Sequence, residues 1–590
     1  MKVYQDKITQ FTLALQSINK KYNSISLVRL LVIVAFFVSV YYYVEQQSML
    51  FIVLAIALFV GFIFLMKLHS KLLNDKKIAN ALLTINKDEL AFVSKRELPF
   101  EDGQEFIDFQ HPYAYDLDIF GAHSLFQNLN RTATFIGKKT LAERLLVLAP
   151  NEEIIENQAA VAELSSKLDW RQDFLAFAKV SQDNQSSYES LLRWSTFNSN
   201  PLSRLTNIGS YILPLLFIGS AIGYLISSNT IFVSAMSYLF IINLAFLGKY
   251  FKRIQIEISN SDNIDKILKQ YSKLLQKVEE EKFSAPKLLA LQQKLKFKEK
   301  NASAHFQELS ELFSKMDSIN NLITATLFNG AFLYNLHALK DLLKWKKEHA
   351  TALEDWLAVI GEFEMLNSFA NLSYNNPDFV FPTLNTDFKI SFNNLSHPLL
   401  TSATRVGNEV QFYPQSFMIL TGSNMSGKST FLRSLGINMV LAGAGSVVCA
   451  AAATVHPLPV LVSMRLSDSL SDSESYFFAE IKRLKQIMNA LEKQPAFVLL
   501  DEILRGTNSD DKRNGTIEVV KKVIANKAIG AIATHDIEVC LTTNAFPAIL
   551  TNKCFEVEIV NDELHFDYKL RDGICKNKSA TFLMTKMGVI

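Results

Sequence analysis

The stretch 422–429 holds the residues of this chain best suited to chemistry. It reads GSNMSGKS and fits the pattern GxxxxGK[ST], in which glycines let successive backbone N–H groups turn onto an anion. A short apolar strand, FMILT, is expected before it and a helix from Ser429 after it. This order of strand, loop and helix is the context that the pattern requires, so the stretch predicts a socket for the phosphates of a nucleotide.

Within this socket, Lys428 is expected to reach the β and γ phosphates of the nucleotide, while the hydroxyl of Ser429 ligates Mg²⁺. The predicted ATP-binding residues are Gly422, Ser423, Asn424, Met425, Ser426, Gly427, Lys428, Ser429 and Thr430.

Two further apolar runs end in polar residues. FVLLDE, at 497–502, predicts a buried strand that delivers two acids to its carboxyl end, with Asp501 holding Mg²⁺ and Glu502 orienting and deprotonating the attacking water. AIGAIATHD, at 528–536, predicts another buried strand, and His535 after it is placed to sense the γ phosphate. The alternatives are a capping or surface role for the acidic pair and a structural role for the histidine.

Between these motifs lies a serine-rich turn, SDSLSDSES, that leads into an amphipathic helix from about Tyr476. A helix amino terminus bearing serine is a good anion site, and this one suits a phosphate bound by a partner subunit. A simple capping box started by Ser475 is the alternative.

Four hydrophobic runs form two predicted membrane hairpins. The runs 27–44 and 48–66 are separated by a three-residue break, and the runs 208–226 and 231–247 are separated by SSNT. Each run approaches the roughly 20 residues that a helix needs to cross a bilayer. A buried helical pair in a soluble core is the alternative for the first hairpin.

The distribution of basic residues predicts the orientation of both hairpins. Neither connecting loop contains Lys or Arg, whereas the flanks carry Lys20, Lys21, Arg29, Lys67, Lys71, Lys76, Lys77, Arg204, Lys249, Lys252 and Arg253. The positive-inside rule therefore predicts a multi-pass protein of the cell membrane with both termini and all large segments in the cytoplasm.

Composition and charge argue against several other classes of protein. The net charge of +2 over 590 residues gives no global basic field of the kind that argues for nucleic acid. The four cysteines show no CxxC spacing, so we expect reduced thiols rather than a zinc site or a disulfide framework. The amino terminus lacks the pattern of a cleaved signal peptide. Residues 68–200 and 252–370 have helical periodicity, and their charge runs are interpreted as solvated helix faces.

The carboxy-terminal motifs together resemble the MutS family of DNA mismatch repair ATPases. TGSNMSGKSTFLR is similar to that family's TGPNMxGKSTxxR, GSVVCA to GxxVPA, DEILRGTNSDD to DExxRGTS, and ATHD to ATHY or ATHF. MRLSDSLSDSESYFFAEI resembles the stretch that ends in STFxxE, which aligns Ser475 with the signature serine and Glu480 with the acid. Segments at 125–150 and near 361–382 resemble the start and end of the family's helical core.

The resemblance implies an ATPase of the ABC-type group that works as a homodimer, in which Ser475 of one subunit acts in trans on ATP and Mg²⁺ held by the other. It does not extend to the mismatch-binding domain, because the first hairpin and a short linker occupy that part of the chain. Mismatch recognition is therefore not carried over, and DNA binding stays open.

We therefore expect a multi-domain fold of transmembrane helical hairpins, an all-α core with lever helices, and an α/β P-loop NTPase domain. The expected parts are a cytoplasmic segment at 1–26, the hairpins at 27–66 and 205–247, core and lever helices at 67–204 and 248–380, and the ATPase domain at 381–590. The predicted function is a membrane-anchored ATPase that moves its lever helices. An ABC-type transporter half and a membrane scaffold or signalling ATPase without DNA binding are the alternatives.

Overall fold

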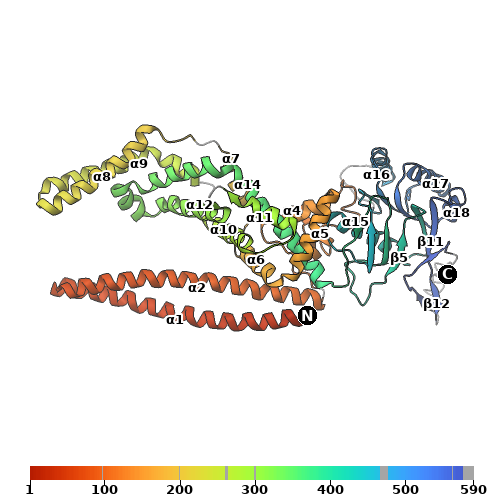
Figure 1. Cartoon of the computed structure of the whole chain (residues 1–590), viewed down its shortest axis with the longest axis horizontal. Coiled ribbons are helices and arrows are strands. Elements are labelled where there is room, and N and C mark those ends of the chain that lie inside the picture. Colours follow the sequence, from red (N-terminus) through yellow and green to blue (C-terminus); the bar gives the residue numbers. More distant parts are fainter. Residues whose placement is uncertain are drawn as a thin grey trace.

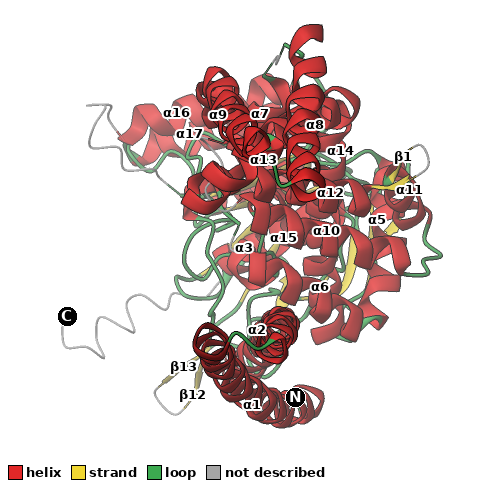
Figure 2. Cartoon of the chain, turned by 90° about the vertical axis from the view of Figure 1, so that its left-hand side faces the viewer, coloured by secondary structure: helices red, strands yellow, loops and turns green. Residues whose placement is uncertain are grey.

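The computed structural model describes residues 1–95, 97–181, 183–197, 200–258, 264–297, 300–465, 476–560 and 563–575. The molecule is elongated: a helical body forms its middle and a domain with mixed sheets forms one end (Figure 1). A first helical hairpin, drawn in red, runs along one side of the body, and a second, drawn in yellow, extends from the end opposite the sheets (Figure 1). The hairpins lie on opposite sides of the body, with their turns at the same end of the molecule (Figures 1 and 2).

The first hairpin consists of α1 (Lys2–Gln46) and α2 (Met49–Lys95). Gln47 turns the chain with a φ of 51°. At 1.5 Å per residue each helix is roughly 70 Å long, about twice the thickness of a bilayer core. The predicted apolar runs are only the ends of these helices near the turn. The segment 1–26 is part of α1, and its Phe11 packs near Leu82 and Ile85 of α2.

The second hairpin consists of α8 (Arg204–Ser227) and α9 (Thr230–Ile258). Among the described residues, these helices and those of the first hairpin are the four that are long and apolar enough to cross a membrane. Within their most apolar windows only 6% of the residues in each helix of the first hairpin and 11% in each helix of the second are buried. Such exposed apolar surface is costly in water and suits lipid.

The helical body lies between the hairpins and the mixed-sheet domain. Its α-helices are α3 (Leu125–Leu129), α4 (Phe135–Leu146), α5 (Asn151–Ser166), α6 (Leu168–Ser181), α7 (Gln185–Thr196), α10 (Ile264–Glu280), α11 (Pro286–Lys294), α12 (Ala302–Asp317), α13 (Asn329–Phe332) and α14 (Tyr334–Asn375). Shorter elements are the 3₁₀ turns Gln104–Phe106 and Ser318–Asn320, the π-helical turn Thr324–Phe328, and the strands β1 (Lys296–Phe297) and β2 (Lys300–Asn301).

Helix α14 has 42 residues and connects the two ends of the body. Near its start, a ring nitrogen of His337 lies 3.0 Å from the carbonyl oxygen of Ser210 in α8. At its end, Asn375 accepts a 2.7 Å hydrogen bond from Tyr4 of α1. Helix α14 therefore contacts both hairpins, and its middle is anchored in the core by fully buried aromatic residues such as Trp356 and Phe363.

The carboxy-terminal domain contains a six-stranded sheet in the order β14-β11-β6-β10-β9-β8. Its strands are β6 (Phe417–Gly422), β8 (Val460–Ser463), β9 (Phe497–Asp501), β10 (Ile529–Ala533), β11 (Leu550–Phe555) and β14 (Leu570–Asp572); all pairings are parallel except that of β14. Helices α15 (Lys428–Ala444), α16 (Tyr476–Leu491), α17 (Ser509–Ala525) and α18 (Ile537–Leu541) accompany the sheet. Strands β6, β8, β9 and β10 are buried at every residue, which accounts for their nearly continuous apolar sequences.

A second sheet, in the order β3-β7-β4-β5, joins this domain to the body. Its strands are β3 (Thr383–Leu384), β4 (Ser391–Leu395), β5 (Asn408–Gln411) and β7 (Ala452–Val455), and a small ribbon is formed by β12 (Glu558–Val560) and β13 (Glu563–His565). One hydrophobic core runs from Tyr113 in the body to Phe555 in β11, so the carboxy-terminal domain and the body are packed together rather than loosely tethered.

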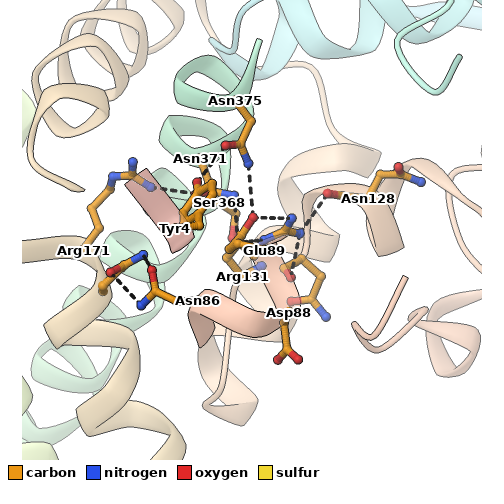
Figure 3. A network of polar contacts seen from close by, with 12 residues as sticks. Tyr4, Asn86, Asp88, Glu89, Asn128, Arg131, Arg171, Ser368, Asn371 and Asn375 are labelled. Carbon is orange, nitrogen blue, oxygen red and sulfur yellow. Dashed lines mark hydrogen bonds and ion pairs between the residues drawn. The ribbon is translucent and has the colours of Figure 1, made fainter. Parts of the chain in front are cut away.

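A buried polar network attaches the first hairpin to the body (Figure 3). Glu89 of α2 is paired with Arg131, which lies between α3 and α4. The amides of Asn371 and Asn375, at the end of α14, each donate a 3.1 Å hydrogen bond to the same carboxylate. Helices α1, α2 and α14 therefore meet around one buried carboxylate.

Candidate functional site

The parallel register of three strands brings the separate motifs together. Ala533 of β10 is paired with Leu420 of β6 on one side and with Asp501 of β9 on the other. The loop after β6, the acids at the end of β9 and the histidine after β10 therefore share one edge of the sheet. The carboxyl edge of a parallel sheet is where α/β domains bind ligands.

The loop between β6 and α15 has the backbone shape of an anion cradle. Gly422, Met425 and Gly427 all have positive φ values, of 154°, 66° and 98°. A Cβ atom on Gly422 would lie 2.6 Å from Oγ of Ser426, so a side chain there would collide with the loop. The hydroxyls of Ser423 and Ser426 are buried without a hydrogen-bond partner among the described residues. The loop thus has unused polar groups and no room for side chains at its glycines.

Lys428 lies inside this loop. Its side chain is buried, and its ammonium group donates hydrogen bonds to the carbonyl oxygens of Gly422, at 2.9 Å, and Ser423, at 3.0 Å. Burial lowers the pKa of Lys428, and the carboxylates of Glu502 and Asp501 oppose that shift. A phosphate oxygen in the loop would give this ammonium group a charged partner in place of two carbonyls.

Ser429 and Asp501, the two predicted Mg²⁺ ligands, are in direct contact. Oγ of Ser429 donates a 2.6 Å hydrogen bond to Oδ2 of Asp501, while Oδ1 of Asp501 is buried without a partner among the described residues. Burial is the main cause that raises the pKa of Asp501. A hydroxyl beside a carboxylate with an unused oxygen fits Mg²⁺, which takes few protein ligands and completes its shell with water and phosphate oxygens.

Glu502 faces His535 across the site. A carboxylate oxygen of Glu502 lies 2.7 Å from Nε2 of the histidine, and this hydrogen bond is the main cause that lowers the pKa of Glu502 to about 2. Glu502 has a φ of 49°, which is uncommon for a residue with a side chain. Its backbone N–H donates to the carbonyl of Ala533, which holds it between β9 and β10. The acid is therefore ionised and fixed beside the loop.

A pocket of about 630 Å³ opens onto these groups. Residues 424–431 and Glu502 form its floor, and the wall is formed by Leu395, His397, Leu400, Thr404, Val406, Asn408, Ser434, Phe555 and Tyr568. Burial lowers the pKa of His397 to about 4, so this ring is neutral at pH 7. A volume of this size with apolar and aromatic walls suits a nucleotide base and sugar.

Sequence patterns did not identify most of this wall. His397 lies in the segment NLSHPLL, which is similar to the opening of the family's ATPase domain, but that similarity gave no role to the ring. No local sequence signal points to Tyr568, which lies 139 positions after Ser429. The fold brings its ring next to the loop, where a Cβ atom on Gly427 would lie 3.0 Å from it.

Glu480 connects α16 to the loop after β9. Its buried carboxylate accepts hydrogen bonds from the backbone N–H groups of Leu504, at 2.7 Å, and Arg505, at 3.1 Å. Ser475 lies outside the described residues, and α16 begins directly after it at Tyr476. Glu480 thus fixes the helix that follows the serine turn to the loop that follows Asp501 and Glu502.

The carboxy-terminal part of the chain is similar to known proteins. Residues 418–588 match the family model described as MutS domain V. The chain is 32% identical over 196 residues to the DNA mismatch repair protein MutS of Methanococcoides burtonii, covering 32% of this chain and 22% of the relative. It is 26% identical over 326 residues to that of Thermotoga neapolitana, covering 54% and 36%.

A human relative gives the same result. The chain is 28% identical over 244 residues to MutS protein homolog 4 of Homo sapiens, covering 39% of this chain and 25% of the relative. The chain therefore matches between about a fifth and about a third of the length of these relatives. Residues 418–588 thus match MutS domain V, and the chain is similar to members of the MutS family.

Proposed function

We propose that this protein is a membrane-anchored ATPase that hydrolyses ATP at the edge of the six-stranded sheet and transmits the nucleotide state to its long helices. The observation that carries the proposal is a set of contacts beside one pocket. Lys428, Ser429 and Glu502 line it. Asp501 lies against Ser429, and His535 lies against Glu502 and Lys428. These are the parts that phosphoryl transfer to water requires: a phosphate cradle, a metal site, a base and a γ-phosphate contact.

Each group has a role that follows from its position. The loop N–H groups and Lys428 bind the phosphates of ATP, and the pocket wall at His397 and Tyr568 encloses the base and sugar. Ser429 and Asp501 would hold Mg²⁺, which supplies charge neutralisation on the phosphate oxygens. Glu502 orients the attacking water and accepts its proton. His535 holds Glu502 in place and can contact the γ phosphate.

The site is proposed to be completed by a second copy of the chain. Ser475 would close onto ATP held by the partner, as the resemblance to the MutS family implies. The hydrogen bonds of Glu480 support this arrangement, because they connect the helix behind Ser475 to the loop that follows the catalytic acids. ATP binding and release would then change the position of the start of α16.

The hairpins are proposed to cross the cell membrane, with the body and the carboxy-terminal domain in the cytoplasm. The exposed apolar surface of their helices and the basic residues at their flanks support this placement. Helix α14 contacts both hairpins, so it is the element best placed to act as a lever. The relatives that are named as DNA mismatch repair proteins make duplex DNA a partner to test rather than an established one.

The direct test is Glu502→Gln in the purified, detergent-solubilised chain. We expect ATP to bind with wild-type affinity and hydrolysis to fall at least about a hundredfold, because a general base contributes about 10² to 10⁴ to a rate. Glu518→Gln on the exposed face of α17 is the matched control and should leave hydrolysis unchanged. Wild-type turnover by Glu502→Gln would refute the assigned site. Binding of labelled duplex DNA, measured over a range of salt concentrations, tests the DNA partner separately.

A further inference from the structure

A second cavity, of about 760 Å³, lies between the first hairpin and the helical body. Helix α2 forms one wall, α10 forms the opposite wall, and Val180, Ser181, Asn184 and Ser187, at the end of α6 and the start of α7, close it. We call this cavity the lysine groove, because its 15 lining residues include Lys67, Lys71, Lys77, Lys266, Lys269 and Lys273. None of the lining residues is acidic.

The positive charge of the lysine groove is poorly compensated. Within the part of the chain that the structure describes, no ion pair joins Lys67, Lys71, Lys77, Lys269 or Lys273 to a carboxylate. Burial is the main cause that lowers the pKa of Lys273, and the neighbouring charge of Lys269 adds to it, while Asp75 of α2 acts in the opposite direction. Like charges gathered in a concave site favour an anionic ligand.

The end wall of the lysine groove adds uncharged groups that suit an anion. Helix α7 begins here: Asn184 caps it and Ser187, in its first turn, lines the groove. The amino terminus of this 12-residue helix carries partial positive charge. Gln270 is only 9% exposed, and its side-chain oxygen has no hydrogen-bond partner among the described residues. Its amide can rotate to donate an N–H to a ligand in the groove.

The lysine groove begins where the apolar part of α2 ends. Lys67 follows Met66, the last residue of the apolar run, and a rise of 1.5 Å per residue places Lys77 roughly 15 Å further along the helix. If the hairpin crosses the membrane as proposed above, the groove opens at the cytoplasmic headgroup layer. Its volume is that of a small-molecule site, whereas a DNA duplex needs a contact surface of about 1,000 Å² or more.

We propose that the lysine groove binds the phosphate-bearing headgroup of an anionic phospholipid, held between α2 and α10 at the cytoplasmic face of the membrane. The headgroup would bridge the hairpin to the body beside the hydrogen bond that Lys273 of α10 donates to Asn74 of α2, at 3.1 Å. Basic pockets at the cytoplasmic ends of membrane helices have the chemistry that such headgroups require. This inference rests on the proposed membrane anchoring.

The test compares two triple variants of the full chain that lose the same charge. The groove variant is Lys71→Gln, Lys77→Gln and Lys269→Gln. The control is Lys20→Gln, Lys21→Gln and Lys252→Gln, which removes three exposed lysines that flank the predicted spans outside the groove. Each protein is reconstituted into bilayers of phosphatidylcholine and phosphatidylglycerol, re-extracted in neutral detergent, and assayed for retained lipid by native mass spectrometry. Unchanged ATP binding and thermal unfolding establish that both variants are folded.

We expect the wild type and the control to retain phosphatidylglycerol in preference to phosphatidylcholine. In the groove variant, the ratio of retained phosphatidylglycerol to phosphatidylcholine should be about tenfold lower. Equal loss in both variants, or no loss in the groove variant, overturns the proposal. Displacement of the lipid by millimolar inorganic pyrophosphate would assign the groove to a soluble phosphate and also overturns it. A groove variant that retains the lipid but no longer binds duplex DNA would likewise overturn the proposal. A wild-type chain that does not enter bilayers refutes the anchoring itself, whereas one that enters without lipid selectivity refutes only the lipid site.

Discussion

Nε of Arg131 lies 2.5 Å from a carboxylate oxygen of Glu89, and each side chain is only 4% exposed. The arginine also stacks over Phe100, with 3.5 Å between the guanidinium carbon and the ring centroid. The amides of Asn371 and Asn375 occupy the remaining positions around the carboxylate. The pair therefore connects the hairpin helix α2, the segment before α4 and the end of α14.

Loss of one partner of this pair should destabilise the protein strongly. Glu89→Ala leaves the Arg131 guanidinium buried without its counter-charge, and such single losses cost about 3–5 kcal/mol. The double variant Glu89→Gln and Arg131→Met should recover part of that loss. The measurement is denaturant unfolding in detergent, followed by tryptophan fluorescence.

The control for the Glu89 and Arg131 variants is the exposed ion pair of Lys139 and Glu143 on α4, whose side chains are 44% and 63% exposed. Glu143→Gln should change stability by less than about 0.5 kcal/mol, because exposed ion pairs contribute little. Equal effects of Glu89→Ala and Glu143→Gln would show that the buried pair does not hold the hairpin to the body.

The Ser429 and Asp501 pair predicts a specific dependence on Mg²⁺. Removing either proposed ligand, by Ser429→Ala or Asp501→Asn, should raise the Mg²⁺ concentration for half-maximal ATP hydrolysis by at least about tenfold, since even indirect contacts to a metal ligand have effects of that size. Excess EDTA should abolish hydrolysis in every variant. Ser463→Ala, at the carboxyl end of β8 outside the pocket, is the control and should keep the wild-type requirement. Mg²⁺ titrations that coincide for all four proteins would rule out this metal site.

Local patterns in the sequence were sufficient for part of this structure. The runs 27–44 and 208–226 predict helices because apolar residues continue for a membrane thickness, and the loop 422–429 predicts its own strand and helix because its glycines and Lys428 have fixed positions. The roles of the site residues remain predictions, and Ser475 lies outside the described residues.

Features that depend on distant contacts could not be predicted in this way. Glu89 and Arg131 are 42 positions apart, and nothing near either residue indicates that burial brings them together. Tyr568 reaches the pocket through the order of strands in the sheet rather than through a motif. The segment 1–26, which the sequence predicts as a cytoplasmic segment, is helical and continuous with the rest of α1, and its apolar side chains, such as Phe11, pack against α2 and α6.

Glu364 of α14 predicts how stability varies with pH. Its fully buried carboxyl group accepts a 2.7 Å hydrogen bond from the backbone N–H of Ala133, and burial raises its pKa from 4.5 to about 8. The folded protein therefore binds this proton more tightly than the unfolded chain does. The stabilisation is complete below pH 4.5 and is lost as pH rises toward 8, by at most about 1.4 kcal/mol per pH unit.

Glu364→Gln removes the titrating group while it keeps the shape of the side chain, so its unfolding free energy should vary less between pH 5 and 8 than that of the wild type. Glu362→Gln, on the same helix and in an ion pair with Lys287, serves as the control and should follow the wild-type profile. The comparison is made by denaturant unfolding at pH 5, 6, 7, 8 and 9. Parallel profiles for Glu364→Gln and the wild type would show that this carboxyl group does not titrate in that range.

The two hairpin turns should lie outside the cytoplasm. Gln47 and Ser228 turn the chain at the same end of the molecule, and the loops around them carry no basic residue. In intact cells, a membrane-impermeant thiol reagent should therefore label Gln47→Cys and Ser228→Cys. The background is Cys575→Ser, because the other three native cysteines are buried. Asn526→Cys, at the partly exposed carboxyl end of α17, should be labelled only after lysis. Labelling of Asn526→Cys in intact cells, or protection of both turns until lysis, would reverse or remove the proposed membrane topology.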